Sequence, residues 1–328
     1  MMSSNKQIRV AFIYHHSNIF LSGTHFDNIY YNFFMKALHR NKKIIVSNFS
    51  TKNLFDTSVL KNNFDIILLW SNNEWGMPKE LMNIENLDIP VIARAADPGD
   101  AKNSIKSHKK WKIDYYFDFL DKSFFYDLYP SNFNHKTIIF GVESSLYQNV
   151  TPMKDRIKDK ILNSGAIGNT KFTSRIINTI RNPKWNALQC YKLRTKCSKL
   201  PYVDYTSTLN HEFVNDKYPL LLQKYTAAIA ANSYNPNVKY WEISAAGCLT
   251  FMEITKKNRG HFLGYKDGEN AIFINESNYQ EKFQEYLDDF NNPKWEKIAN
   301  SGRDFTLKNF SNDQAVSSLV DLMENLLN

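Results

Sequence analysis

The chain has 328 residues, with 43% hydrophobic and 23% charged residues, a composition typical of a globular protein of about two domains. The net charge of +8 permits an anionic partner: a nucleotide, a nucleic acid or an anionic membrane surface. The absence of an apolar run of about eighteen residues excludes a transmembrane helix. The three cysteines match neither a zinc site nor a disulfide framework, and with no signal peptide at the N-terminus they predict a cytoplasmic protein.

In the first half of the chain, apolar runs alternate with helical segments. Residues 26–40 have apolar side chains at helical spacing. The run Phe64–Trp70 is continuous, as in a strand buried on both faces of a parallel sheet. The predicted strands are residues 8–16, 42–49, 64–70, 89–98, 113–120 and 136–143. This alternation predicts a doubly wound α/β domain over residues 1–145.

A second alternating pattern begins after Glu143 and predicts another α/β domain over residues 146–328, with a hinge near residues 142–154. Its predicted helices are residues 173–182, 217–225 and 238–247, followed by further helices toward the C-terminus. Its predicted strands are residues 159–164, 187–193, 226–233, 248–254 and 271–276.

The loop after the first strand of the second domain is rich in small residues. Gly165 and Gly168 would let the backbone approach an anion, and Lys171 or Arg175 could neutralise a phosphate. Ligands of open α/β sheets bind where such loops leave the carboxyl ends of strands. The pattern is neither a dinucleotide-binding nor a Walker A loop, and a simple tight turn remains the alternative.

The segment Asn237–Ile254 places an acid, Glu242, early in a predicted helix and just before a run of small residues. One carboxylate can accept hydrogen bonds from both vicinal hydroxyls of a ribose. Lys239, about one turn earlier, would suit a diphosphate beside that ribose. The alternative is a carboxylate that only complements the helix dipole.

The run Lys239–Ile254 resembles the donor-binding motif of GT-B glycosyltransferases, in particular the CgeB-like branch of the glycosyltransferase group 1 superfamily. The downstream segment Gly260–Asn275 and the segment Ile138–Tyr147 resemble further parts of that family. The resemblance implies two Rossmann-like domains that face each other across a cleft. It also implies that the C-terminal helix can return to the first domain.

The resemblance implies a glycosyltransferase that moves a sugar from a nucleotide-diphosphate sugar to an acceptor hydroxyl, with no bound cofactor and no metal. Glu242 would hold the ribose of the donor, and Lys239 and Arg175 would face its diphosphate. Tyr234 stands where many relatives have a second acid, which leaves open how the sugar ring is held. The donor-binding residues expected on this basis are Gly165, Lys171, Arg175, Lys239, Tyr240, Glu242 and Gly247.

The first domain is expected to supply the acceptor side. His16, which follows the first strand, is a candidate general base or phosphate contact, and Asp97 is a second catalytic candidate. A packing histidine and a turn-forming aspartate are the respective alternatives. The turn with Gly23 and Thr24 is expected nearby on the acceptor side.

The acceptor is a glycan, a lipid-linked sugar or a small molecule in the first hypothesis, in which positive charge also favours a peripheral position on an anionic membrane. In the second hypothesis the enzyme has the same fold but its acceptor is DNA, which the basic run Lys106–Lys112 would permit. The third hypothesis is a non-catalytic, two-lobed protein that binds a sugar or nucleotide, and the fourth is a sugar-nucleotide epimerase.

Overall fold

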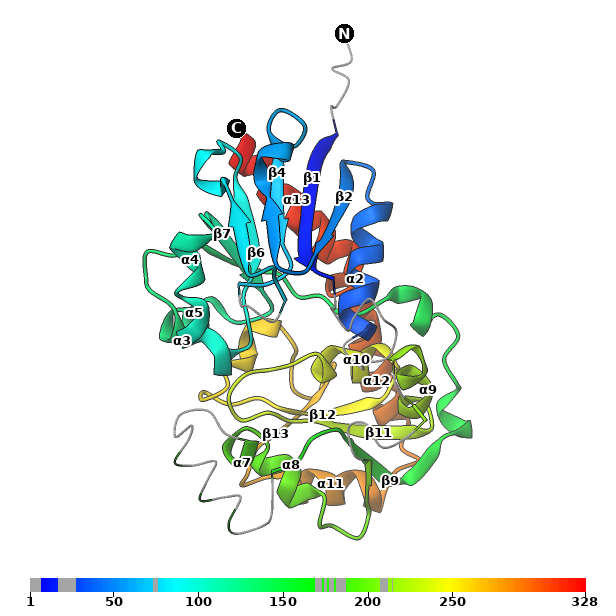
Figure 1. Ribbon diagram of the computed structural model, residues 1–328. Coiled ribbons are helices and arrows are strands. Elements are labelled where there is room, and N and C mark those ends of the chain that lie inside the picture. The colour runs from blue at the N-terminus through cyan, green and yellow to red at the C-terminus, as the bar shows by residue number, and fades with distance from the viewer. Residues whose placement is uncertain are drawn as a thin grey trace. The chain divides into compact units, whose positions relative to one another are not determined.

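The computed structural model describes residues 7–16, 28–72, 76–168, 187–206, 212–213 and 215–328, together with the single residues 173, 176 and 180. The chain divides into two compact units, each described separately below. The first combines residues 1–140 with residues 312–328, and the second spans residues 141–311. In Figure 1 the first unit runs from blue to cyan and ends in the red helix, and the second runs from green to orange.

A sheet of six strands forms the centre of the first unit, and all neighbouring strands run parallel. The strands, in order across the sheet, are β2 (Ile44–Thr51), β1 (Ile8–His15), β4 (Ile66–Leu69), β6 (Val91–Arg94), β7 (Tyr115–Asp118) and β8 (His135–Thr137). β4 and β6 are buried along their whole length, which explains why their sequences are continuous apolar runs.

Five α-helices accompany this sheet among the described residues: α2 (Asn28–Arg40), α3 (Ala101–Ser104), α4 (Ser107–Lys110), α5 (Lys122–Leu128) and α13 (Asn312–Leu327). α13 belongs to this unit although it ends the chain, and Figure 1 shows it behind the strands. Its residues Val316, Leu319 and Met323 are buried in the same apolar core as the strands. The predicted boundary after residue 145 therefore differs from the observed division, which follows Phe140 and returns at Asn312.

A small parallel sheet of β3 (Leu54–Asp56) and β5 (Glu80–Met82) also lies in the first unit. The sequence pattern does not predict this sheet. Each strand has three residues, too few for an alternating pattern to stand out from the surrounding turns.

The second unit contains a parallel sheet of five strands. Its strands, in order across the sheet, are β10 (Val203–Thr206), β9 (Ile157–Ser164), β11 (Tyr225–Ala230), β12 (Leu249–Glu253) and β13 (Ile272–Ile274). Its described α-helices are α7 (Ala187–Cys190), α8 (Lys192–Cys197), α9 (Tyr218–Leu222), α10 (Lys239–Ala245), α11 (Tyr279–Asp288) and α12 (Pro293–Asn309). β11 and β12 are wholly buried, and no described helix of either unit is long and apolar enough to span a membrane.

The predicted strand at residues 187–193 is wrong, because these residues lie in α7 and α8. Cys190, Leu193 and Cys197 recur at intervals of three and four and form one buried helical face. The strand that follows, β10, was not predicted. The predicted helix at residues 173–182 lies mostly outside the described residues.

Candidate donor-binding site

The carboxyl edge of the second unit's sheet brings together the end of β9 and the first turns of α9 and α10. Ser164 ends β9 and Gly165 follows it, whereas Tyr218 begins α9 and Lys239 begins α10. Ligands of open parallel sheets bind at this edge. Six residues at this edge are called the donor-site cluster below: Ser164, Gly165, Arg194, Tyr218, Lys239 and Glu242.

Gly165 is required at its position for two reasons. Its φ of +98° lies in the left-handed region that favours glycine. A Cβ atom at this position would lie 2.6 Å from Cε of Lys239 and 2.7 Å from Nη2 of Arg194. The groups that approach its backbone are thus two basic side chains, which places positive charge at the end of β9.

Lys239 reaches from α10 across to α9. Its Nζ donates a hydrogen bond of 2.9 Å to Oη of Tyr218, and that oxygen lies 2.5 Å from Oγ of Ser164. Burial lowers the pKa of the Lys239 ammonium, the nearby Arg194 lowers it further, and Glu242 opposes both effects. No carboxylate of the described residues lies within ion-pair distance of Nζ, so this cation can serve an anionic ligand.

Glu242 lies on α10 three residues after Lys239 and is 2% exposed. Burial raises the pKa of its carboxyl above the ordinary value, and Lys239 opposes the rise. Burial raises the pKa of the Tyr147 and Tyr218 phenols, and the charge of the nearby Glu242 raises the pKa of both further. A carboxylate that only complemented the helix dipole would be solvated, so the burial of Glu242 favours a ligand-binding role.

Arg194 is the main residue of this edge that the sequence analysis missed. It is 1% exposed on α8, where Nη2 donates to the carbonyl oxygen of Ser164 and Nε lies 3.4 Å from Oδ1 of Asn163. Its guanidinium also stacks 5.3 Å from the ring centre of Tyr191. An arginine within the buried helical face of Cys190, Leu193 and Cys197 was the available signal, and the strand assignment concealed it.

Tyr240 also lies on α10, but its hydroxyl is used in hydrogen bonds to the backbone of the protein. It is fully buried, and its Oη accepts a hydrogen bond of 3.0 Å from the amide of Asn232. The same oxygen donates at 3.0 Å to the carbonyl of Glu253. Tyr240 therefore ties the carboxyl ends of β11 and β12 together.

Gly247 lies at the other end of α10, next to the amino end of β12. Its φ of +70° ends the helix in the left-handed region. The guanidinium of Arg156, which precedes β9, donates 3.1 Å hydrogen bonds to the carbonyls of Ala246 and Gly247. Gly247 is thus separated from Gly165 by the length of the sheet and lies away from the donor-site cluster.

Four further candidates lie outside the described residues: Gly23, Thr24, Lys171 and Arg175. Among the residues that are described, no group of three His, Cys, Asp or Glu side chains could hold a metal ion.

The two catalytic candidates both lie at the carboxyl edge of the first unit's sheet. His16 follows β1, is exposed, and its amide donates a 2.9 Å hydrogen bond to the carbonyl of Thr51. Asp97 follows β6 and precedes the short 3-10 helix Pro98–Asp100. Burial, followed by the charge of Asp97, raises the pKa of Asp100. This edge therefore offers both an imidazole and carboxylates.

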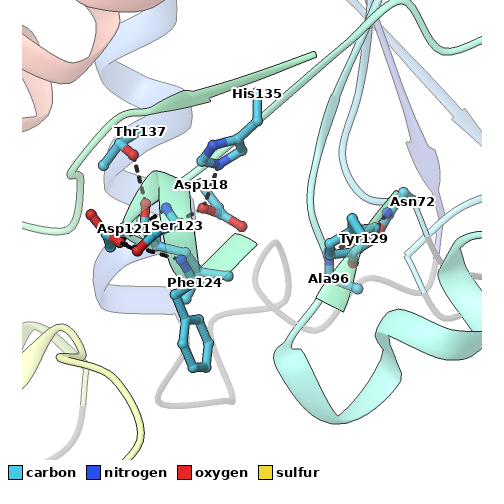
Figure 2. Close-up of polar contacts among 10 residues, drawn as sticks. Asn72, Ala96, Asp118, Asp121, Ser123, Phe124, Tyr129, His135 and Thr137 are labelled. Atoms are coloured by element: carbon cyan, nitrogen blue, oxygen red, sulfur yellow. Dashed lines mark hydrogen bonds and ion pairs between the residues drawn. The ribbon is translucent and has the colours of Figure 1, made fainter. Parts of the chain in front are cut away.

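The same edge contains buried polar pairs that the sequence analysis did not single out (Figure 2). Oδ1 of Asp118, at the end of β7, accepts a 3.0 Å hydrogen bond from Nε2 of His135 on β8. Asn72, just after β4, accepts a 2.7 Å hydrogen bond from the amide of Ala96, and its Nδ2 lies 3.4 Å from Oη of Tyr129. These contacts connect β7 with β8, and the segment after β4 with the segment after β6.

A family model described as glycosyl transferase-like matches residues 129–321, more than half of the chain. The chain belongs to this family. The predicted class of enzyme, a glycosyltransferase, is thereby confirmed. No curated protein matches the chain.

Solved structures with the same architecture cover nearly the whole chain. HepE from Anabaena in complex with UDP-glucose has a TM-score of 0.58 and 10% identity, over 97% of this chain and 100% of that chain. A sucrose-phosphate synthase from Thermosynechococcus elongatus has a TM-score of 0.58 and 10% identity, over 98% and 99%. An α-glucosyltransferase in complex with UDP-glucose and DNA containing an abasic site has a TM-score of 0.58 and 9% identity, over 97% and 100%. At such identities the likeness establishes the fold, and it confirms the predicted GT-B class.

Proposed function

We propose that this glycosyltransferase takes its sugar from a nucleotide-diphosphate sugar bound at the donor-site cluster and transfers it to an acceptor hydroxyl. The observation that carries this proposal is the burial of Glu242 beside Lys239 at the carboxyl edge of the second unit's sheet. The cluster offers the carboxylate of Glu242 as a hydrogen-bond acceptor for hydroxyls. Next to it, Lys239 and Arg194 offer cations for phosphates. A nucleotide sugar presents these two kinds of group side by side.

Glu242 would accept hydrogen bonds from the ribose hydroxyls, which a carboxylate can do with both oxygens. Lys239 would turn from Tyr218 to the diphosphate, and Arg194 would add positive charge from behind. Because Gly165 has no side chain, it would leave room for the phosphates beside Lys239 and Arg194. Lys171 and Arg175 stay predicted phosphate ligands.

The leaving group of the reaction is the nucleoside diphosphate, on which negative charge grows as the bond to the sugar breaks. Lys239 and Arg194 would stabilise that charge, a contribution that needs no metal. On the acceptor side, His16 is the proposed general base and Asp97 an alternative. Gly23 and Thr24 stay predicted acceptor-side residues.

Two finer assignments rest on the sequence. The run Lys239–Ile254 supports membership of the CgeB-like branch within the glycosyltransferases. The net charge of +8 supports peripheral association of a cytoplasmic enzyme with an anionic membrane, where lipid-linked acceptors would lie.

The test of the proposed function is thermal stabilisation of the purified protein by UDP, GDP, CDP, ADP and dTDP and by their common sugar forms. UDP comes first, because HepE and the α-glucosyltransferase above are both complexes with UDP-glucose. A ligand that binds only the folded state stabilises it by RT ln(1 + [L]/Kd), so micromolar binding is detected. Stabilisation by one diphosphate supports the proposal, and no stabilisation by any of them contradicts it.

DNA is the second candidate acceptor, supported by the net charge and by the exposed side chains of Lys109 and Lys110 in the basic run. A protein that neutralises several DNA phosphates loses affinity steeply as salt rises. Binding of a DNA duplex that weakens at least about tenfold between 50 and 200 mM salt would favour this acceptor. A transfer rate on a glycan acceptor that is insensitive to salt would favour the first.

A further inference from the structure

An unpaired hydroxyl group lies near the donor-site cluster, on Tyr147 in the short 3-10 helix Ser144–Tyr147 that precedes β9. The side chain of Tyr147 is fully buried, yet its hydroxyl has no hydrogen-bond partner among the described residues. Buried hydroxyls are normally hydrogen-bonded, because an unpaired one has lost its contacts with water and gained nothing in return. Phenylalanine would fill the same space without this cost, so the hydroxyl needs an explanation.

The backbone around Tyr147 is fixed to the second unit. Nη2 of Arg303 on α12 donates a 2.6 Å hydrogen bond to the carbonyl of Tyr147. Further along, the amide of Thr151 donates at 2.9 Å to Oε1 of Gln223, and Nε of Arg156 donates at 2.8 Å to the carbonyl of Thr151. Because its backbone is held and its ring is buried, Tyr147 can offer its hydroxyl only to groups that already lie beside it.

Three ionisable groups lie near this hydroxyl. Burial raises the pKa of the phenol most, and Glu242, Tyr218 and Cys248 raise it further, in that order. Oη of Tyr218 already accepts a 2.9 Å hydrogen bond from Nζ of Lys239, and the thiol of Cys248 already donates to a backbone carbonyl at 3.2 Å. Glu242 is the group left to receive the hydroxyl, and its carboxylate is also the strongest acceptor of the three.

The carboxylate of Glu242 is itself weakly held in the ligand-free protein. Burial raises the pKa of its carboxyl and the ammonium of Lys239 lowers it, and no hydrogen bond from a described residue adds to these effects. A ligand that binds such a carboxylate has to hold it in one orientation, which costs conformational entropy. A protein donor that occupies one lone pair would lower that cost. Because the hydroxyl of Tyr147 is shielded from solvent, it would act on a nucleotide through Glu242 rather than by direct contact.

We propose that Tyr147 is a positioning residue of the donor site, whose hydroxyl donates a hydrogen bond to the carboxylate of Glu242 in the nucleotide-bound protein and orients it toward the ribose. The inference rests on the proposed function, which assigns Glu242 to the nucleotide. In the ligand-free protein the hydroxyl stays unpaired, and binding of the nucleotide gives it a partner. The free protein is thus less stable than phenylalanine at this position would make it, and the complex is tighter.

The experiment compares Tyr147→Phe with the wild-type protein in two measurements, thermal unfolding without ligand and calorimetric binding of UDP. If the thermal-shift panel selects another nucleoside diphosphate, that one replaces UDP. We expect the variant to melt at the same or a higher temperature and to bind UDP at least about tenfold more weakly, because a hydrogen bond to a charged group is lost from the complex alone. A residue that only supports the fold would instead lower stability and affinity together.

Tyr286→Phe on α11 is the matched control. Tyr286 is also fully buried in the second unit, but its hydroxyl donates a 2.7 Å hydrogen bond to the carbonyl of Lys158. Lys158 lies near the start of β9, whereas the donor-site cluster lies at the end of that strand. This substitution should lower the melting temperature and leave UDP binding unchanged, which is the reverse of the result expected for Tyr147→Phe.

A double-mutant cycle tests whether Tyr147 acts through Glu242. In the Glu242→Ala background the acceptor is gone, so Tyr147→Phe should cause no further loss of UDP affinity.

The other outcomes separate this inference from the proposed function. Additive losses in the double variant overturn the inference, and so does wild-type affinity in Tyr147→Phe. A lower melting temperature of Tyr147→Phe overturns it as well, because the hydroxyl would then have a partner in the free protein. If the wild-type protein binds none of the diphosphates, the proposed function fails and the inference fails with it, whereas the first three results contradict the inference alone.

Discussion

At the scale of single residues, the second unit holds two buried glutamates at one sheet edge, and their neighbours differ. Glu242 has the ammonium of Lys239 beside it, whereas Glu253 has the hydroxyl of Ser233. The sequence predicted Glu242 because it precedes a run of small residues on a helix. It could not predict Glu253, because an acid at the end of a strand is common and only burial distinguishes this one.

Replacement of Glu242 tests its assignment to the ligand. We expect Glu242→Ala to weaken nucleotide binding at least about tenfold, because a hydrogen bond to a charged group contributes roughly 1.5–3 kcal/mol. The melting temperature of the ligand-free protein should stay nearly unchanged, because the cost of burying the carboxylate offsets its attraction to Lys239. Calorimetry and thermal unfolding check this, with the exposed Glu269→Ala as control. A large loss of thermal stability would make Glu242 a structural residue.

A methyl group at Gly165 tests the crowding at the end of β9. Gly165→Ala should lower the melting temperature and weaken nucleotide binding, because the new Cβ would displace Lys239 and Arg194. The matched control is Gly268→Ala, where φ is +72° and nothing lies within 4 Å of the added atom. Both variants carry backbone strain of about 1–2 kcal/mol, so only the difference between them reports the crowding. Equal effects of the two substitutions would argue against crowding at Gly165.

The ionisation of Glu253 predicts a pH dependence of stability. Burial raises the pKa of this carboxyl from 4.5 to about 7 in the folded protein. The group therefore stabilises the fold fully below pH 4.5, and this contribution is lost as the pH rises to about 7. We expect the melting temperature of Glu253→Gln, relative to the wild type, to increase between pH 5 and pH 8. A difference that is constant over this range would show that Glu253 titrates normally.

At the scale of elements, the long and continuous patterns were predicted and the short ones were not. The runs that became β4, β11 and β12 are buried on both faces, so their apolar content alone identifies them. Residues 187–193 are too few to distinguish a strand from a helix. Their assignment depends on Cys197, one turn further on, which completes the helical face. With the helix misassigned, the position of Arg194 at the carboxyl edge could not be predicted.

The helical face of α8 gives a test at this scale. Leu193→Ala should lower the free energy of unfolding by about 2–5 kcal/mol, because Leu193 is fully buried against the second unit's sheet. Leu220→Ala on α9 is the matched control, since that side chain is 55% exposed, and it should change stability by less than about 0.5 kcal/mol. Urea unfolding measures both. Similar values for the two would mean that α8 does not pack on the sheet.

At the scale of the whole molecule, the chain leaves the first unit after Phe140 and returns to it at Asn312. The resemblance to GT-B enzymes suggested such a return, but composition and periodicity could not, because α13 is an amphipathic helix like many others. Its partners are set by tertiary contacts. The apolar face of α13 enters the core of the first unit, and Asp313 pairs with Arg40 of α2 at 2.6 Å.

Two substitutions separate the apolar contacts of α13 from its ion pairs. Leu319→Ala, at a fully buried position, should lower the free energy of unfolding of the first unit by about 2–5 kcal/mol. Arg40→Ala removes a partly exposed ion pair and should cost less than about 1 kcal/mol. Hydrogen exchange of the amides of β1 and β4 reads the stability of this unit. If Leu319→Ala leaves that exchange unchanged, α13 is not part of its core.

The return of α13 also constrains the order in which the protein can fold during its synthesis. A ribosome releases the N-terminal sheet long before it makes residues 312–328, so the core around Val316, Leu319 and Met323 stays incomplete until those residues are made. The second unit, continuous in sequence from residue 141 to residue 311, has no such delay. The unit that emerges first is therefore expected to mature last, and a nascent chain stalled before residue 312 should expose its apolar surface to chaperones.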